Sequence, residues 1–142
     1  MTEPSKIHAT LAAYFAGING EDYESVGRLF AEDGELRAPG TKPRKGPEGV
    51  ATYFEDALAP YPEHHDEPTR VLVSGSSATV EITFNGITAE GAPLNFDAVD
   101  VFDFDDEGRV LLLTSWYDSY VVRATLKAAR AGVNPPDRSS EH

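Results

Sequence analysis

The sequence contains no cysteine, and its 12 lysines and arginines are outnumbered two to one by 24 aspartates and glutamates. Without cysteine the chain has no disulfide framework, no thiol nucleophile and no cysteine-ligated zinc site. The formal net charge of -12 argues against binding to nucleic acid or anionic membranes, because phosphate-rich surfaces recruit Lys and Arg. No apolar run is long enough to span a bilayer or resembles a secretory signal, so we expect a cytoplasmic protein without a membrane partner.

Sequence motifs with a fixed catalytic spacing are also missing. The glycines of "GTKPRKGPEG" lack the spacing of a Walker or dinucleotide-binding loop, and no nucleophile-elbow pattern occurs. The four histidines match no zinc-ligand spacing. We therefore expect neither a metal nor a cofactor, and any chemistry has to come from ordinary acids, bases and hydroxyl groups.

Hydrophobic periodicity divides the chain into a helical part and a strand part. Apolar residues at helical spacing predict helices within 5–22, 21–34 and 47–58, with the short strand "ELRAP" between the last two. After the expected loop "APYPEHHDEP" the period changes to two, which predicts strands over 69–73, 78–89, 94–104 and 109–122. Helices followed by consecutive strands indicate an α+β fold with helices on one face of an antiparallel sheet. We expect one domain, 1–132, and a disordered tail, 133–142.

One acid is out of place in the strand "LNFDAVDVFDF". Read at every second residue, Asp100 shares its face with apolar neighbours on both sides, including Ala98 and Phe102. Burying an ionised carboxylate is costly, and the usual escape is a raised pKa. A neutral acid in an apolar pocket can donate a hydrogen bond to a developing oxyanion. The structural alternative is an aspartate satisfied by a neighbouring N–H or Arg, or turned to solvent by a bulge.

Tyr14, His64 and His65 are the other candidates for chemistry. Tyr14 lies on the apolar stripe of the first helix, where an ordinary core tyrosine is the alternative. His64 and His65 are adjacent in "PEHHDE", and His is the natural general base near neutral pH. Neighbouring strand residues point opposite ways, so at most one of the two faces a cavity, and two exposed histidines are the alternative. For the last strand, both alternate sets of "RVLLLTSWYDSYVV" are half apolar, so periodicity does not choose its inward face.

The stretch "AAYFAGINGEDYESVGRLFAEDGELRAPGTKPRKGPEGVATYF" and the final hairpin "DVFDFDDEGRVLLLTSWYD" resemble NTF2-like proteins, in particular their SnoaL-like and ketosteroid isomerase branch. That resemblance implies a conical barrel, in which a curved, mainly antiparallel sheet wraps around three N-terminal helices and encloses an apolar pocket. It places Tyr14 and Asp100 at the paired oxyanion-hole positions of the isomerases. It also favours an inward face of Leu113, Ser115 and Tyr117 on the last strand.

The same resemblance shows which general bases are absent. The isomerase base position is occupied by Ala38, and the acid/base position of SnoaL-type cyclases by Ser115. Phe54 stands where the isomerases often have a supporting tyrosine. His65 or His64 is therefore the expected base, followed by Glu63 or Asp118. The residues expected to line the pocket are Phe30, Ala38, Tyr53, Phe54, Phe84, Ala98, Phe102, Leu113, Ser115 and Tyr117.

The implied function is isomerisation or cyclisation of a hydrophobic cyclic, polyketide-like or steroid-like carbonyl compound. In this interpretation Tyr14 and Asp100 stabilise an enol or enolate. Two alternatives remain: a cyclase that acts by orienting its substrate without a base, and a protein that binds a hydrophobic phenol or ketone without turnover. Val99 and Val101, on the outer face of the same strand, lead us to expect a homodimer.

Overall fold

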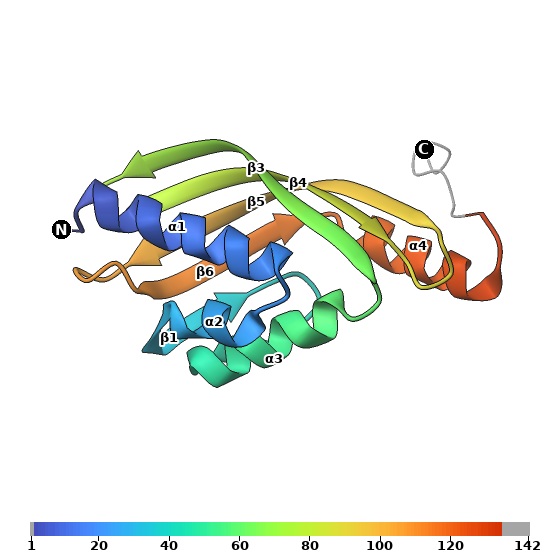
Figure 1. Ribbon diagram of the computed structural model, residues 1–142, viewed down its shortest axis with the longest axis horizontal. Helices are drawn as coiled ribbons and strands as arrows, with labels where there is room; N and C mark the ends of the chain where they lie inside the picture. The colour runs from blue at the N-terminus through green and yellow to red at the C-terminus, as the bar shows by residue number, and fades with distance from the viewer. Residues whose placement is uncertain (1, 135–142) are drawn as a thin grey trace.

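A computed structural model describes residues 2–134 and shows helices packed against a strongly curved sheet (Figure 1). The elements in chain order are α1 (Pro4–Asn19), α2 (Tyr23–Arg28), β1 (Phe30–Arg37), β2 (Arg44–Lys45), α3 (Gly46–Leu58), β3 (Glu63–Ser74), β4 (Ser77–Ile87), β5 (Pro93–Phe104), β6 (Val110–Tyr117) and α4 (Ser119–Ala131). The strands form one sheet in the order β2-β1-β6-β5-β4-β3. Its pairs are antiparallel apart from β1 with β6, which is parallel.

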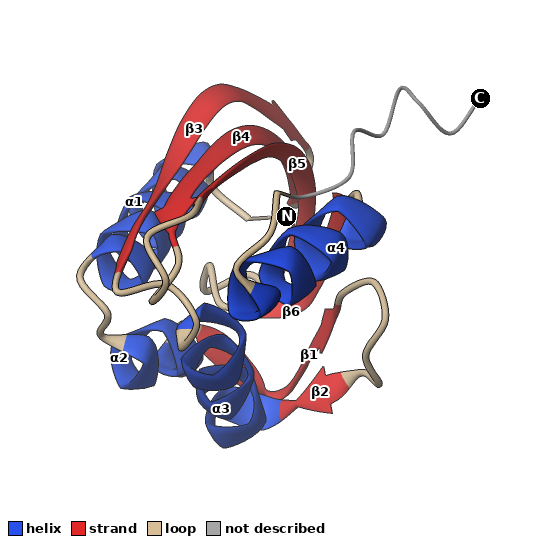
Figure 2. Ribbon diagram, turned by 90° about the vertical axis from the view of Figure 1, so that its right-hand side faces the viewer, coloured by secondary structure: helices blue, strands red, loops and turns tan. Residues whose placement is uncertain are grey.

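These observations confirm the α+β class and the curved, mainly antiparallel sheet. They correct one detail, because β2 and β3 are edge strands and the sheet is open instead of closing into a barrel. Figure 2 shows β3, β4 and β5 arching over α1, with α2 and α3 on the opposite side of the interior. The interior of this arch is where the core and the pocket lie.

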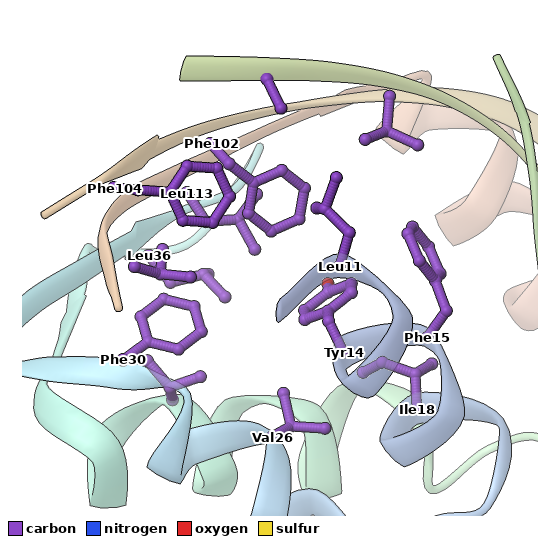
Figure 3. Packing of buried hydrophobic residues seen from close by; sticks show 14 of the residues in the cluster. Leu11, Tyr14, Phe15, Ile18, Val26, Phe30, Leu36, Phe102, Phe104 and Leu113 are labelled. Atoms are coloured by element: carbon purple, nitrogen blue, oxygen red, sulfur yellow. The ribbon is translucent and has the colours of Figure 1, made fainter. Parts of the chain in front are cut away.

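The first helix supplies much of the core because its apolar residues recur at helical spacing. Ile7, Leu11, Tyr14 and Ile18 are all buried, as the stripe predicts. Figure 3 shows Leu11 and Tyr14 of this stripe facing side chains from β1, β5 and β6. The buried partners from those strands include Phe30, Leu36, Phe102, Phe104, Val110 and Leu113.

Two boundaries differ from the sequence prediction. The second helix ends at Arg28, so Phe30, expected on its apolar stripe, opens β1. The expected loop before residue 69 belongs to β3, which begins at Glu63. Pro68 suggested a loop because it cannot donate to a ladder, but β3 is an edge strand and its register shifts between Pro68 and Arg70, which accommodates the proline.

The fourth helix was not expected from the sequence. The valines after Tyr117 prolonged the strand pattern, yet the chain turns at Asp118, whose carboxylate accepts hydrogen bonds from the backbone N–H groups of Tyr120 and Val121. The helix ends at Gly132 in the left-handed conformation. Figure 2 shows α4 lying across one end of the arched sheet.

No helix in 2–134 is long and apolar enough to cross a membrane. The predicted tail, 133–142, lies outside the described residues after its first two positions.

Candidate active site

A pocket opens inside the arch between α1, α3, the strands β3 to β6 and α4. Its volume is about 650 Å³ when the solvent-filled mouth is included. The wall is mostly aromatic and aliphatic, with carboxyl groups at Asp66 and Asp100. Its lining residues are Tyr14, Tyr53, Phe54, Ala57, Leu58, Tyr61, Asp66, Ile82, Phe84, Phe96, Ala98, Asp100, Ser115, Tyr117 and Val122. This composition suits a hydrophobic ligand with a few polar groups.

Asp100 is buried in the wall of this pocket, with 4% of its surface exposed. Its register partner on β6 is Ser115, and the Ser115 hydroxyl donates a hydrogen bond to the carboxylate. Oδ1 of Asp100 has no hydrogen-bond partner within 2–134. Burial raises the pKa of Asp100 to about 7, against the opposing effect of the Ser115 hydrogen bond. The acid is therefore substantially protonated near neutral pH and has an oxygen free to engage a ligand.

Tyr14 faces the same cavity from α1. Its ring packs edge-on against Phe54 and Phe102, at centroid distances of 5.9 and 5.2 Å. Burial, followed by the nearby charge of Asp100, raises the pKa of the Tyr14 phenol well above its usual range. The hydroxyl therefore keeps its proton at any working pH and can serve as a hydrogen-bond donor.

Two further tyrosines of the pocket wall form a pair. Tyr53 of α3 hydrogen-bonds with Tyr117 of β6, and burial raises the pKa of Tyr53. The guanidinium of Arg44 lies over the Tyr53 ring at 5.6 Å from its centroid. Tyr117 also packs on Phe96, so its ring contacts an aromatic side chain of the wall while its hydroxyl bonds with Tyr53.

Asp66 is the second acid of the pocket. It lies on the inward face of β3. The side-chain amide of Asn19, at the end of α1, forms hydrogen bonds with both the backbone C=O and the backbone N–H of Asp66. The Asn19 amide nitrogen donates to the Asp66 carbonyl over 2.9 Å, and the Asp66 N–H donates to the Asn19 amide oxygen over 2.8 Å. Burial raises the pKa of Asp66 to about 6. The charge of Asp66 in turn raises the pKa of Asp100, so the two acids share one electrostatic environment.

Residues 11–112 match the family of SnoaL-like domains. The chain belongs to the SnoaL-like family.

Solved structures support the same SnoaL-like architecture. A hypothetical protein with a ketosteroid isomerase-like fold from Catenulispora acidiphila, in complex with trimethylamine, is 18% identical, with a TM-score of 0.75 over 94% of this chain and 95% of that one. SalBIII, an epoxide hydrolase/cyclase-like enzyme of pyran ring formation in the polyether salinomycin, is 21% identical, with a TM-score of 0.73 over 84% of this chain and 96% of that one. An LEH-like epoxide hydrolase from M. tuberculosis is 20% identical, with a TM-score of 0.71 over 90% of this chain and 94% of that one. At these identities the likeness concerns the fold, whose members include small-molecule enzymes.

The histidines expected to act as bases lie outside the lining of this SnoaL-like pocket. His65 faces outward, with 54% of its side chain exposed, and pairs with Glu67 over 2.8 Å. His64 faces inward with 1% exposed, but its Nε2 lies 3.3 Å from both the Tyr23 hydroxyl and a Glu21 carboxylate oxygen. The expectation that at most one of the two faces inward is confirmed. The further candidates are also displaced, because Glu63 is exposed and Asp118 caps α4.

Four residues expected in the pocket wall do not line it. Phe30, Phe102 and Leu113 are buried in the main hydrophobic cluster, and Ala38 packs against it. They support the wall without lining it. The other expected wall residues, Tyr53, Phe54, Phe84, Ala98, Ser115 and Tyr117, do line it.

The burial pattern along β6 explains why periodicity alone did not identify the inward face of this strand. Leu113 is buried, Ser115 and Tyr117 line the pocket, and Trp116 is 62% exposed, as the family resemblance favours. Val110 is buried too, although it belongs to the opposite alternate set. A register shift between Asp103 and Phe104 of β5 changes the phase of β6 opposite it, so neither set is inward throughout.

Sequence reasoning missed Asp66 because it treated "PEHHDE" as a loop. Continuing the strand back to Glu63 puts Asp66 on the same face as His64, two residues earlier. The alternation of His64 and Asp66 on one strand face could therefore have identified Asp66, but Pro68 led to the prediction of a loop.

Proposed function

We propose that this SnoaL-like protein is an isomerase or cyclase for a hydrophobic cyclic, polyketide-like or steroid-like carbonyl compound. The observation that carries the proposal is Asp100, a buried acid in an aromatic pocket with one oxygen unpartnered within 2–134. A buried polar atom without a partner inside the protein is suited to a partner on the ligand.

The chemistry follows from the two donors. A carbonyl oxygen of the substrate accepts hydrogen bonds from the Tyr14 hydroxyl and from protonated Asp100. When a proton leaves the carbon beside the carbonyl, negative charge develops on that oxygen, and both donors become stronger partners for it. The surrounding rings exclude water and so strengthen these interactions.

Binding of β-naphthol tests the donor pair, because a phenolate resembles an enolate in charge and shape. We expect Tyr14→Phe and Asp100→Leu each to weaken β-naphthol binding by at least about tenfold, as measured by calorimetry, since a hydrogen bond to a charged group contributes about 1.5–3 kcal/mol. Asp97→Asn, on the exposed outer face of β5, is the matched control. Unchanged affinity in both pocket variants would refute the oxyanion role.

Binding without turnover is the second candidate, and the wall favours an amine-bearing ligand for it. The lining residues include carboxyl groups and aromatic rings but no lysine, arginine or histidine. Such a wall attracts an ammonium group through charge and cation–π contacts. The Catenulispora protein of similar fold holds trimethylamine. Tighter binding of N,N-dimethylbenzylamine than of its neutral isostere isobutylbenzene, with no new product after long incubation, would support this candidate over the enzyme.

We also propose that the outer face of β5 and β6 seats a second copy of the chain. Trp116 is 62% exposed there, beside the partly buried Val99 and Val101. We expect light scattering to give a dimer that Trp116→Lys dissociates. A monomeric wild-type protein would refute this assembly.

A further inference from the structure

The geometry points to Asp66 as the proton acceptor of this pocket and to Asn19 as the residue that positions it. This inference rests on the proposed function, because a donor pair for an enolate requires a base on the same cavity. It assigns that base to a residue outside the positions of the isomerase and cyclase bases, which this chain fills with Ala38 and Ser115.

The carboxylate of Asp66 lies in the pocket and accepts no hydrogen bond from residues 2–134, as the role of a base requires. It lines the pocket together with Tyr14 and Asp100. Its hydrogen bonds with Asn19 use only its backbone atoms, and within 2–134 no group donates to its carboxylate. A carboxylate that accepts no hydrogen bond from the protein keeps its lone pairs available for a substrate proton.

The charges around Asp66 favour a division of roles between the two acids. Tyr14 from α1, Tyr23 from α2 and Asp100 from β5 interact electrostatically with it, and His65 does so from its own strand. Two interacting acids titrate as a pair, and the one with the lower pKa loses its proton first. The pKa of Asp66 is raised to about 6 and that of Asp100 to about 7. Asp100 is buried whereas Asp66 is only partly buried, so the pair loses its first proton mainly from Asp66, which leaves Asp66 as the base and Asp100 as the acid.

The other candidates lack either access or basicity. Ala38 has no proton-accepting group, and the Ser115 hydroxyl already donates to Asp100. His64 engages Glu21 and Tyr23 and is not part of the wall. Among the lining residues, Asp66 is the carboxylate that the donor pair does not use.

The step is a proton transfer in which the Asp66 carboxylate forms an O–H bond as the α-C–H bond of the ketone breaks. The electron pair of that bond becomes the C=C bond of the enolate, while the carbonyl π electrons move to oxygen, facing Tyr14 and Asp100. A proton then returns from the Asp66 carboxyl group to a carbon of the enolate, either the original one or its conjugated γ-carbon, and when that carboxyl group has exchanged its proton with water in the meantime the returning atom comes from solvent. No oxidant, reductant or second reactant is needed, and the carboxylate is regenerated.

Asn19 holds this acid at a sheet edge that would otherwise be loosely fixed. β3 is an edge strand, so the Asp66 N–H and C=O that point away from β4 have no strand partner. The Asn19 amide takes both, in the manner of a neighbouring strand. A shift of about 1 Å in a catalytic group can cost roughly 100-fold in rate, which is why we infer a positioning role.

The experiment follows deuterium uptake by β-tetralone in heavy water, with wild-type protein and variants, by NMR. We expect Asp66→Asn to lower the exchange rate at least about 100-fold, since general-base catalysis contributes typically 10²–10⁴-fold. β-Naphthol affinity at about pH 5 should stay within about threefold of wild type, because Asp100 is protonated there in both proteins and the donor pair is intact. Asp66→Glu should retain measurable exchange because the carboxylate is kept. Asp97→Asn, an outward acid two strands away in the sheet, is the matched control.

The pH profile separates positioning from simple structural support. Wild-type exchange should rise as Asp66 loses its proton near pH 6 and fall as Asp100 loses its proton near pH 7, which gives a narrow bell. Asn19→Ala should lower the maximum and move the acidic limb to lower pH, because a less firmly held Asp66 is better solvated and burial is what raises its pKa, while β-naphthol binding stays unchanged. A uniform loss of rate and binding at every pH would show a structural role for Asn19 instead.

The outcomes distinguish the two proposals. Exchange that is lost in Tyr14→Phe and Asp100→Leu but kept in Asp66→Asn would overturn the assignment of the base and leave the enolate chemistry intact. Absence of exchange in the wild type, with β-naphthol still bound, would overturn both and favour the binding protein. Circular dichroism of each variant verifies that it is folded, and the isosteric Asp66→Asn leaves the Asn19 hydrogen bonds available.

Discussion

The substitution Asp100→Asn should make the stability of the protein less sensitive to pH. Asp100 is 4% exposed, and its pKa is raised to about 7 in the folded state. In the unfolded chain an aspartate titrates near 3.9. Between these values the folded protein binds more protons than the unfolded chain, so the free energy of unfolding falls as the pH rises from about 4 to about 7 and is level above that.

The magnitude follows from the two pKa values. A difference of about 3 corresponds to roughly 4 kcal/mol at high pH, at about 1.4 kcal/mol for each pKa unit. About 3 kcal/mol of the unfolding free energy should be lost between about pH 5 and pH 8, because the rest of the loss has already occurred between about pH 4 and pH 5. Asn has nearly the same shape and does not titrate, so Asp100→Asn should escape this loss.

Urea unfolding at about pH 5 and pH 8, followed by circular dichroism, measures the effect. The quantity of interest is the change in unfolding free energy between the two pH values, compared between wild type and Asp100→Asn. Asp97→Asn serves as the control, because Asp97 is exposed on the outer face of β5. Parallel stability profiles for wild type and Asp100→Asn would refute the buried, protonated acid.

Other consequences of the structure can be checked in the same way. Ser115→Ala should raise the pKa of Asp100 further, because the Ser115 hydrogen bond lowers it, so β-naphthol binding should persist to higher pH; an unmoved titration would contradict this. Gly27→Ala should destabilise the fold by about 1–3 kcal/mol in urea titrations, since its Cβ would lie 2.2 Å from the Pro47 carbonyl oxygen. Asp118→Ala should cost about 1 kcal/mol and speed amide hydrogen exchange in α4 alone, and equal acceleration throughout the sheet would argue against a local cap.

The order of helices and strands could be predicted because burial imposes a period on each element. The α1 stripe and the alternation on β5 identified Tyr14 and Asp100 correctly as inward residues. The family resemblance supplied the topology, which period alone does not give.

The remaining features were decided by local departures from these periods. A proline hid the first half of β3, and with it Asp66. Valines that favour strands hid α4, whose start depends on the Asp118 cap. The register shift beside β6 broke its alternation. The pairing of Asn19 with Asp66 joins residues 47 positions apart in the chain, so no local pattern could show it.

The amide of Asn19 also bears on how the sheet ends. An edge strand with a continuous row of free N–H and C=O groups is a template for adding strands from other molecules. On β3 the groups of Asp66 are occupied by Asn19, Pro68 has no N–H, and the register shift follows directly after it. The interruption falls in the middle of the longest exposed edge, so the side chain that fixes the pocket acid also opposes fibril-like growth of the sheet.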